Sequence, residues 1–109
     1  MILDTIRTEL NDFKKNNTEK RFDIVEVPYG GIYDDVNYEV VELDENNKPK
    51  HRVAEINVDD LIGHYKIKIE YRNQWYPKFK VYAEKIADAL GKINNCSVTI
   101  SNVIKKIGD

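Results

Sequence analysis

Apolar and charged residues alternate from Tyr65 to Tyr71, the most regular stretch of the chain. Because successive side chains of a strand point to opposite faces, the apolar positions share one face and the charged positions share the other. From Phe79 to Ile93 the spacing changes, and apolar residues recur at steps of three and four, as on one side of an amphipathic helix. The two stretches predict a half-buried strand followed by a helix that packs on its apolar face.

The same two periods predict the remaining elements. Apolar residues near the N-terminus follow a helical stripe, and shorter alternating runs bounded by turn residues indicate strands. We expect a helix at 2–13 and strands at 21–27, 36–43, 52–58 and 97–101, with a turn at 59–63. The segment 103–107 either extends the last strand or forms a short turn.

This order of elements predicts the fold class. A helix, a run of strands, a second helix and a last strand are typical of an α+β domain with a mostly antiparallel sheet of four to five strands. We expect the N-terminal and the C-terminal helix to pack on one face of that sheet. At 109 residues, the chain is long enough for one core, so residues 1–109 are expected to form a single domain.

The charge of the chain limits its partners. A net charge of -2 argues against general affinity for nucleic acid, which requires a strongly basic surface. The first residues lack the apolar run of a signal peptide, and no segment approaches the roughly 20 apolar residues of a membrane span. We therefore expect a cytoplasmic protein, or one in a particle assembled there, with no specific nucleic-acid or membrane partner.

Residues with catalytic or metal-binding chemistry are few. Asp59 and Asp60 lie close to His64 in the sequence, but their spacing fits no metal-ligand template, and acidic residues before a strand are common in turns. His51 lies beside a polar loop, and Cys96, the one cysteine, is expected to be a small, partly buried residue at a strand start. No nucleophile elbow is present. We expect no enzymatic activity, no metal and no cofactor.

Aromatic residues are more frequent than one small core needs. The chain has seven tyrosines and one tryptophan, and several of them fall in predicted loops rather than on apolar stripes. Loop aromatics are enriched at protein interfaces, where they bury a large area at little cost in entropy. The loop aromatics either form such an interface or cap the ends of the core. They are Tyr29, Tyr33, Trp75 and Tyr76.

The polar segment 44–50 is predicted to be the tip of a hairpin. It is longer than the usual loop of about two to five residues, and it mixes acidic with basic side chains. We therefore expect it to be a contact surface with another copy or a partner, while the loop aromatics supply most of the affinity. The candidate interface residues at the tip are Asp44, Glu45, Asn46, Asn47 and Lys48.

The order of elements resembles the bacteriophage tail terminator and tail-completion (head–tail joining) proteins of long-tailed phages. Three features match: an amphipathic helix near residue one, an alternating strand at 65–71, and the pattern A-x-x-I-A-x-x-L at 83–90. The helix is carried by Ile2, Leu3, Ile6 and Leu10. The chain departs from the family in its link Trp75-Tyr76-Pro77, which replaces the usual polar link, and in its short C-terminal segment.

The resemblance implies a virion structural protein, not an enzyme. Such a protein forms a homo-oligomeric ring, commonly a hexamer, that caps the tail tube and joins it to the head. Its expected partners are its own copies, the tail tube and the head connector proteins. Its expected place is the cytoplasm of the bacterial host and then the virion.

Two other interpretations stay open. The second is a small inhibitory or immunity protein of the anti-defence type, which binds and blocks one target enzyme. The third is a DNA-modifying or hydrolytic enzyme. The mass in solution separates the first two, because a ring of copies supports the phage interpretation, whereas a monomer bound to one foreign enzyme supports the inhibitor.

Overall fold

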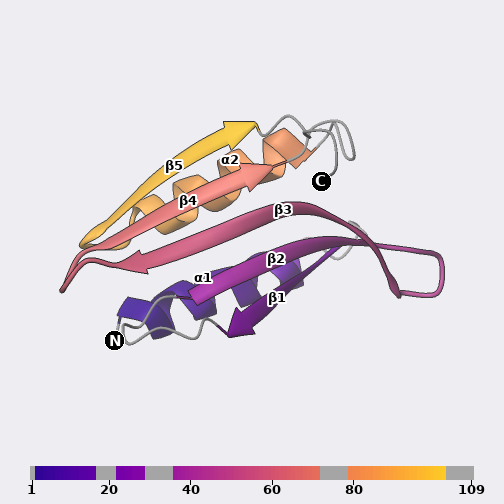
Figure 1. The fold of residues 1–109 in the computed structure, drawn as a ribbon, viewed down its shortest axis with the longest axis horizontal. Helices are drawn as coiled ribbons and strands as arrows, with labels where there is room; N and C mark the ends of the chain where they lie inside the picture. The colour runs from indigo at the N-terminus through magenta and orange to yellow at the C-terminus, as the bar shows by residue number, and fades with distance from the viewer. Residues whose placement is uncertain (1, 17–21, 29–35, 72–78, 103–109) are drawn as a thin grey trace.

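The computed structural model of the chain describes residues 2–16, 22–28, 36–71 and 79–102. These residues form two helices and five strands. The elements are α1 (Ile2–Asn16), β1 (Phe22–Pro28), β2 (Val36–Leu43), β3 (Pro49–Asp60), β4 (Tyr65–Tyr71), α2 (Phe79–Gly91) and β5 (Cys96–Asn102). The strands lie in one sheet in the order β1-β2-β3-β4-β5, as Figure 1 shows.

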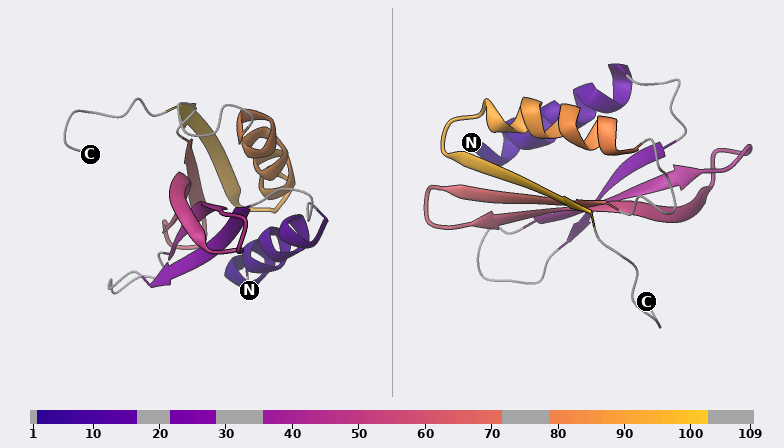
Figure 2. Two further views of the ribbon diagram at one scale, coloured as in Figure 1. Left: turned by 90° about the vertical axis from the view of Figure 1, so that its right-hand side faces the viewer. Right: turned by 90° about the horizontal axis from the view of Figure 1, so that it is seen from above.

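This arrangement confirms the predicted α+β fold. The first four strands pair antiparallel with their neighbours, and β5 pairs parallel with β4. A parallel pair needs a crossover connection, and the segment that contains α2 provides it between β4 and β5. Both helices lie on the same face of the sheet, as predicted (Figure 2, right).

The helices form where the sequence pattern places them. In α1 an acidic residue in the first turn and two lysines in the last turn complement the helix dipole. Its buried residues, Leu3, Ile6 and Leu10, recur at steps of three and four. Among the described residues, no helix is long and apolar enough to span a membrane.

The core lies between the helices and one face of the sheet. Ile67 and Ile69 of β4 and Ile86 and Leu90 of α2 are at most 1% exposed and belong to one buried cluster. The strand and helix stripes of the sequence therefore meet, as predicted. Partly buried Val98 and Ile100 extend this cluster toward the edge at β5.

The other face of the sheet is polar. Glu39, Glu55 and Glu70 are paired across β2, β3 and β4 and form a row of like charges. Arg52 offsets part of this repulsion, because its guanidinium lies 2.8 Å from Glu55 and 3.3 Å from Glu39. A sheet with one buried and one charged face fits a two-layer fold in which this side contacts water.

A bulge in β3 changes the course of the β2–β3 hairpin. Val40 is opposite Ala54 and Val41 is opposite Arg52, so Val53 has no partner on β2. Val53 and Ala54 are both buried although they are adjacent in the chain. Beyond the bulge the hairpin bends and reaches past the rest of the sheet (Figure 1).

Four aromatic rings join the two helices to β1. Phe22 of β1 lies 6.0 Å from Phe13 of α1, 5.8 Å from Phe79 and 5.7 Å from Tyr82 of α2, measured between ring centroids. Phe13 and Tyr82 are in edge contact at 6.4 Å. Such pairs add to the apolar burial, so this cluster fixes how both helices sit on the sheet.

An ion pair holds α1 on β1 outside the core. Arg7 donates from Nε to Glu26 Oε1 at 2.8 Å, and the hydroxyl of Tyr38 donates to the same oxygen at 3.0 Å. The hydrogen bond from Arg7 lowers the pKa of Glu26, and burial together with the bond to Glu26 raises the pKa of Tyr38. This network makes the contact between α1 and the sheet dependent on pH.

The first prediction concerns the core. Replacing Ile86 by Ala removes a fully buried side chain and leaves a cavity, so the free energy of unfolding should fall by roughly 2–5 kcal/mol. Urea melts of the two proteins measure the change. Val81→Ala on the exposed side of the same helix is the matched control and should change stability by less than about 0.5 kcal/mol. Equal effects of the two variants would contradict the packing described.

The second prediction concerns acid stability. Glu26 has a lower pKa folded than unfolded, so its contribution is complete above its unfolded pKa of roughly 4.3 and is lost as the pH falls through the folded value. Glu26→Gln should therefore be less stable than the parent at neutral pH, and the difference should vanish in acid. The effect should be small because the side chain is 40% exposed.

Melts between neutral and strongly acidic pH measure this difference. The control is Asp12→Asn, which removes an exposed acid of α1 outside the proposed contact surfaces and should give a curve parallel to that of the parent. A constant gap between Glu26→Gln and the parent at every pH would contradict the role assigned to this carboxylate.

Candidate protein-interaction site

The β2–β3 loop is shorter than the sequence indicated. Strand β3 begins at Pro49, so Pro49 and Lys50 belong to the strand and the loop is Asp44 to Lys48. Five residues lie within the usual range for a hairpin. The prediction that this tip is longer than its strands need was therefore wrong, because the pairing continues past the bulge to Leu43 and Pro49.

Asp44 organises the loop. Its carboxylate Oδ1 accepts hydrogen bonds from the backbone N–H of Asn46 at 2.8 Å and of Lys48 at 3.0 Å. Its own N–H donates to the Lys48 carbonyl at 2.8 Å, and Asn47 adopts a φ of 62°, which suits asparagine. Asp44 thus holds the backbone of the tip, a structural task that its prediction as an interface residue did not include.

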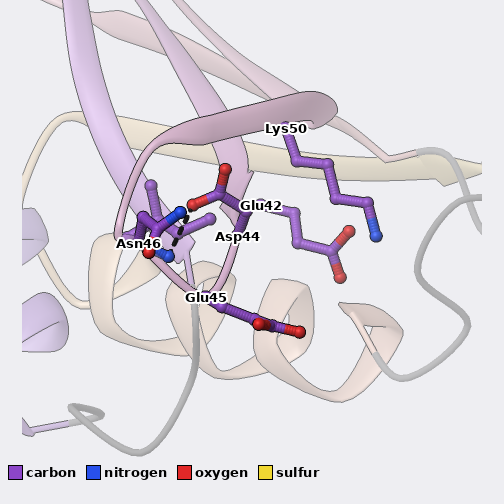
Figure 3. Close-up of a pocket in the computed structure, with 6 residues that line it drawn as sticks. Glu42, Asp44, Glu45, Asn46 and Lys50 are labelled. Atoms are coloured by element: carbon purple, nitrogen blue, oxygen red, sulfur yellow. Dashed lines mark hydrogen bonds between the residues drawn. The ribbon is translucent and has the colours of Figure 1, made fainter.

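The other tip residues, from Glu45 to Lys48, are exposed. Glu42, Glu45 and Lys50 extend toward the same side of the hairpin, while Asp44 and Asn46 bond within the loop (Figure 3). Together with Leu43 these residues line an open pocket of about 460 Å³. The tip is therefore a charged, accessible end without an apolar anchor, and its role as a contact surface stays a prediction.

The tyrosines divide between the core and the segments outside the described residues. Four of them are buried, and none of these four is among the predicted loop aromatics. The buried ones are Tyr38, Tyr65, Tyr71 and Tyr82. The predicted interface aromatics Tyr29, Tyr33, Trp75 and Tyr76 lie outside the described residues, so whether they form an interface or cap the core stays open.

The histidines and Asp60 contact polar groups of their own or neighbouring elements. His64 Nε2 lies 3.2 Å from the hydroxyl of Ser97, and the carboxylate of Asp60 accepts the N–H of Ile62 at 3.0 Å, as a turn residue does. His51 Nε2 lies 3.0 Å from Glu42 on the neighbouring strand. Within the described ranges, no three His, Cys, Asp or Glu side chains converge as a metal site requires.

The β3–β4 turn has an exposed apolar pair that sequence reasoning assigned only to a turn. Leu61 is 54% exposed and Ile62 is 89% exposed. This turn lies at the opposite end of the sheet from the β2–β3 tip (Figure 1). An exposed apolar pair at a tip is a candidate contact surface for another protein. The signal in the sequence was an apolar pair before Gly63, where turns usually carry polar residues.

Ile62 is also strained. The N–H of Leu61 donates to the carbonyl of His64 at 2.7 Å, and both residues between them have positive φ, 57° for Ile62 and 87° for Gly63. A tight turn of this type favours asparagine or glycine at the first position, and a β-branched residue there is a genuine outlier. Ile62 lowers stability and gains no burial in return, which favours a role in binding.

A groove between the two helices lies at the end of the molecule where α1 begins and α2 ends. It has a volume of about 670 Å³. Ile2, Ala89 and Ile93 form its apolar part, and Glu9 and Lys92 contribute charge. The loop that closes it is bonded to the start of β4, because Asn95 accepts the N–H of Tyr65 at 2.7 Å. The groove can receive a small apolar side chain with polar groups around it.

In the comparisons with known proteins, no family model, no curated protein and no solved structure matches this chain. The resemblance to tail terminator proteins therefore stays a prediction from the order of elements.

The third prediction tests the strain in the turn. Replacing Ile62 by Asn keeps the turn but relieves the left-handed β-branched residue, so the free energy of unfolding should rise by about 1 kcal/mol. Thermal and urea melts measure the gain. Leu61→Asn is the control, since it removes a neighbouring exposed apolar side chain from a residue without positive φ, and it should leave stability nearly unchanged. Destabilisation by Ile62→Asn would mean that this side chain packs against the fold.

Proposed function

We propose that the chain is a non-enzymatic assembly protein that binds further copies of itself, and that it serves as a ring-forming subunit of the tail terminator type. The observation that carries the proposal is Ile62, an apolar side chain that is 89% exposed in a strained backbone conformation. A protein gains nothing from such a residue in isolation, whereas a subunit gains a contact.

The proposed contact is heterologous. The turn of one copy, with Leu61 and Ile62, inserts into the groove of the next copy, where Ile2, Ala89 and Ile93 supply the apolar surface. A projection on one subunit that meets a pocket on its neighbour builds a ring if the rotation closes, and a filament if it does not. A cap on a tail tube requires the closed ring.

The polar β2–β3 tip then faces a different partner. It lies at the far end of the sheet from the turn, and it presents Glu45 and Lys48 on a backbone held by Asp44. Exposed charges add little affinity but orient a partner as it approaches. In the terminator proposal this end meets the tail tube or the head connector.

The fourth prediction separates the two halves of the contact. A turn variant, Leu61→Ser with Ile62→Asn, and a groove variant, Ala89→Lys, should each assemble less than the parent in light scattering. The two variants are then given different tags and mixed. The groove variant supplies an intact turn, and the turn variant supplies an intact groove. The mixture should therefore recover a heteromer that affinity capture of one tag reveals through the other.

Val81→Ser is the control, because it removes an exposed apolar side chain of α2 that lies outside both surfaces. It should assemble like the parent. The proposal fails if the turn and groove variants keep the parental mass. If the parent is a monomer that instead binds one foreign enzyme, the inhibitor interpretation takes its place.

A further inference from the structure

Strand β5 forms an edge of the sheet, with β4 as its only neighbouring strand among the described residues. It spans seven residues without a charge or a proline, Cys-Ser-Val-Thr-Ile-Ser-Asn. Its side chains alternate between half-buried and exposed along most of its length. Natural sheets usually protect such an edge with charges, proline or a covering segment, because an unprotected strand pairs with another chain.

The opposite edge, β1, is protected in this way. The N–H of Ile24 donates to the carboxylate of Asp23 at 2.9 Å, and the carbonyl of Ile24 accepts from Lys14 Nζ at 3.3 Å. Both outward backbone groups of this residue are therefore occupied by side chains. The strand also carries Glu26 and ends at Pro28, which has no N–H to donate. The two edges of one sheet thus differ in their readiness to pair.

The backbone of β5 is oriented for pairing. Asn95 accepts a hydrogen bond from Tyr65, so the carbonyl of Asn95 points to β4. Because backbone groups of alternate residues point to opposite sides of a strand, Ser97, Thr99 and Ser101 also direct their N–H and C=O groups to β4. Val98 and Ile100 direct theirs outward, at the free edge.

The strand is complementary to itself. If two copies of β5 pair antiparallel around a two-fold axis at Thr99, the residues from Ser97 to Ser101 find a partner in register, while the N–H of Cys96 already donates to the carbonyl of Ile93. Val98 then faces Ile100 of the other copy on the apolar face, and Ser97 faces Ser101 on the polar face. The outward backbone groups of Val98 and Ile100 make the hydrogen bonds, and the two Thr99 residues form the non-hydrogen-bonded pair at the axis.

We propose that β5 is a self-pairing edge, at which a second copy of this chain adds its own β5 antiparallel and extends the sheet from five strands to ten. The two-fold axis keeps both pairs of helices on the same face of the joined sheet. This edge adjoins the groove, because Asn94 and Asn95 of the groove directly precede β5, but it shares no residue with the groove or the turn, and the inference does not rest on them.

The flank of α2 supports the second copy as the occupant. The ring of Tyr82 contacts Phe13 of α1, and the helical period places Lys80 and Glu84 on the opposite side, away from α1. Across the two-fold axis the α2 helices run antiparallel. Each copy therefore brings a basic and an acidic side chain, Lys80 and Glu84, to the flank nearest the axis, so charges of both signs are present on the two flanks. A peptide of another protein brings no such flank.

Engineered cross-linking tests the register. In the full chain with Cys96→Ser, the substitution Thr99→Cys places two thiols at the axis, where the Cα atoms of such a pair lie about 4.5 Å apart and within reach of a disulfide. Mild oxidation should give a covalent dimer. In the matched control, Cys96→Ser with Ser97→Cys, the two thiols lie more than about 13 Å apart, and the yield should be at least tenfold lower.

Equal yields from the two variants, or no dimer from Thr99→Cys, would overturn the proposal.

A second measurement uses Thr99→Lys, which places like charges at the axis. Residue 99 is exposed, so the lysine does not enter the core. Both proteins also carry Leu61→Ser and Ile62→Asn, which remove the proposed turn contact. The dimer measured by sedimentation equilibrium then reports on β5 alone. Thr99→Lys should raise the dissociation constant of that dimer at least tenfold. An unchanged dissociation constant, with an unchanged melting temperature, would overturn the proposal.

Discussion

Burial of one face of the sheet is the constraint on which the rest of the structure depends. Ile56, Ile67 and Ile69 cannot contact water without a large loss of free energy, so a second layer has to cover them. Two helices provide that layer, and the ring cluster around Phe22 fixes both on the same side. The position of α2 has a further consequence. Because this helix lies within the connection between β4 and β5, it returns the chain to the start of β4, and β5 runs parallel to β4. Strand β5 is also the last in the order of the sheet, so it forms an edge.

With the core thus closed, the described residues offer the polar face, the edges and the ends of the sheet, and the groove between the helices as surfaces for binding. The polar face is partly neutralised internally by Arg52, and the edge at β1 is occupied by Lys14 and Asp23. The strained turn at Ile62 and the uncharged edge at β5 remain, and each departs from what stability alone favours. Places where local rules fail without a compensating gain are expected at functional sites.

Periodicity predicted most of the fold, because the alternating and helical stripes report burial directly: β2 and β4 have the predicted bounds, and both helices lie on the predicted face. The bulge at Val53 was not visible, since one extra residue in a strand only interrupts an alternation, and so the predicted loop was too long. The site was largely missed. The strain at Ile62 depends on its backbone dihedral angles. The difference between the edge strands β1 and β5 depends on the directions of their hydrogen bonds. Neither follows from residue type alone.

The mass of the unmodified chain in solution tests the central claim, that this protein assembles with itself, most directly. Native mass spectrometry combined with light scattering over a range of concentrations gives that mass without any substitution. The account predicts species at multiples of the 12.8 kDa chain that grow with concentration. A species of 12.8 kDa alone at every concentration would contradict it.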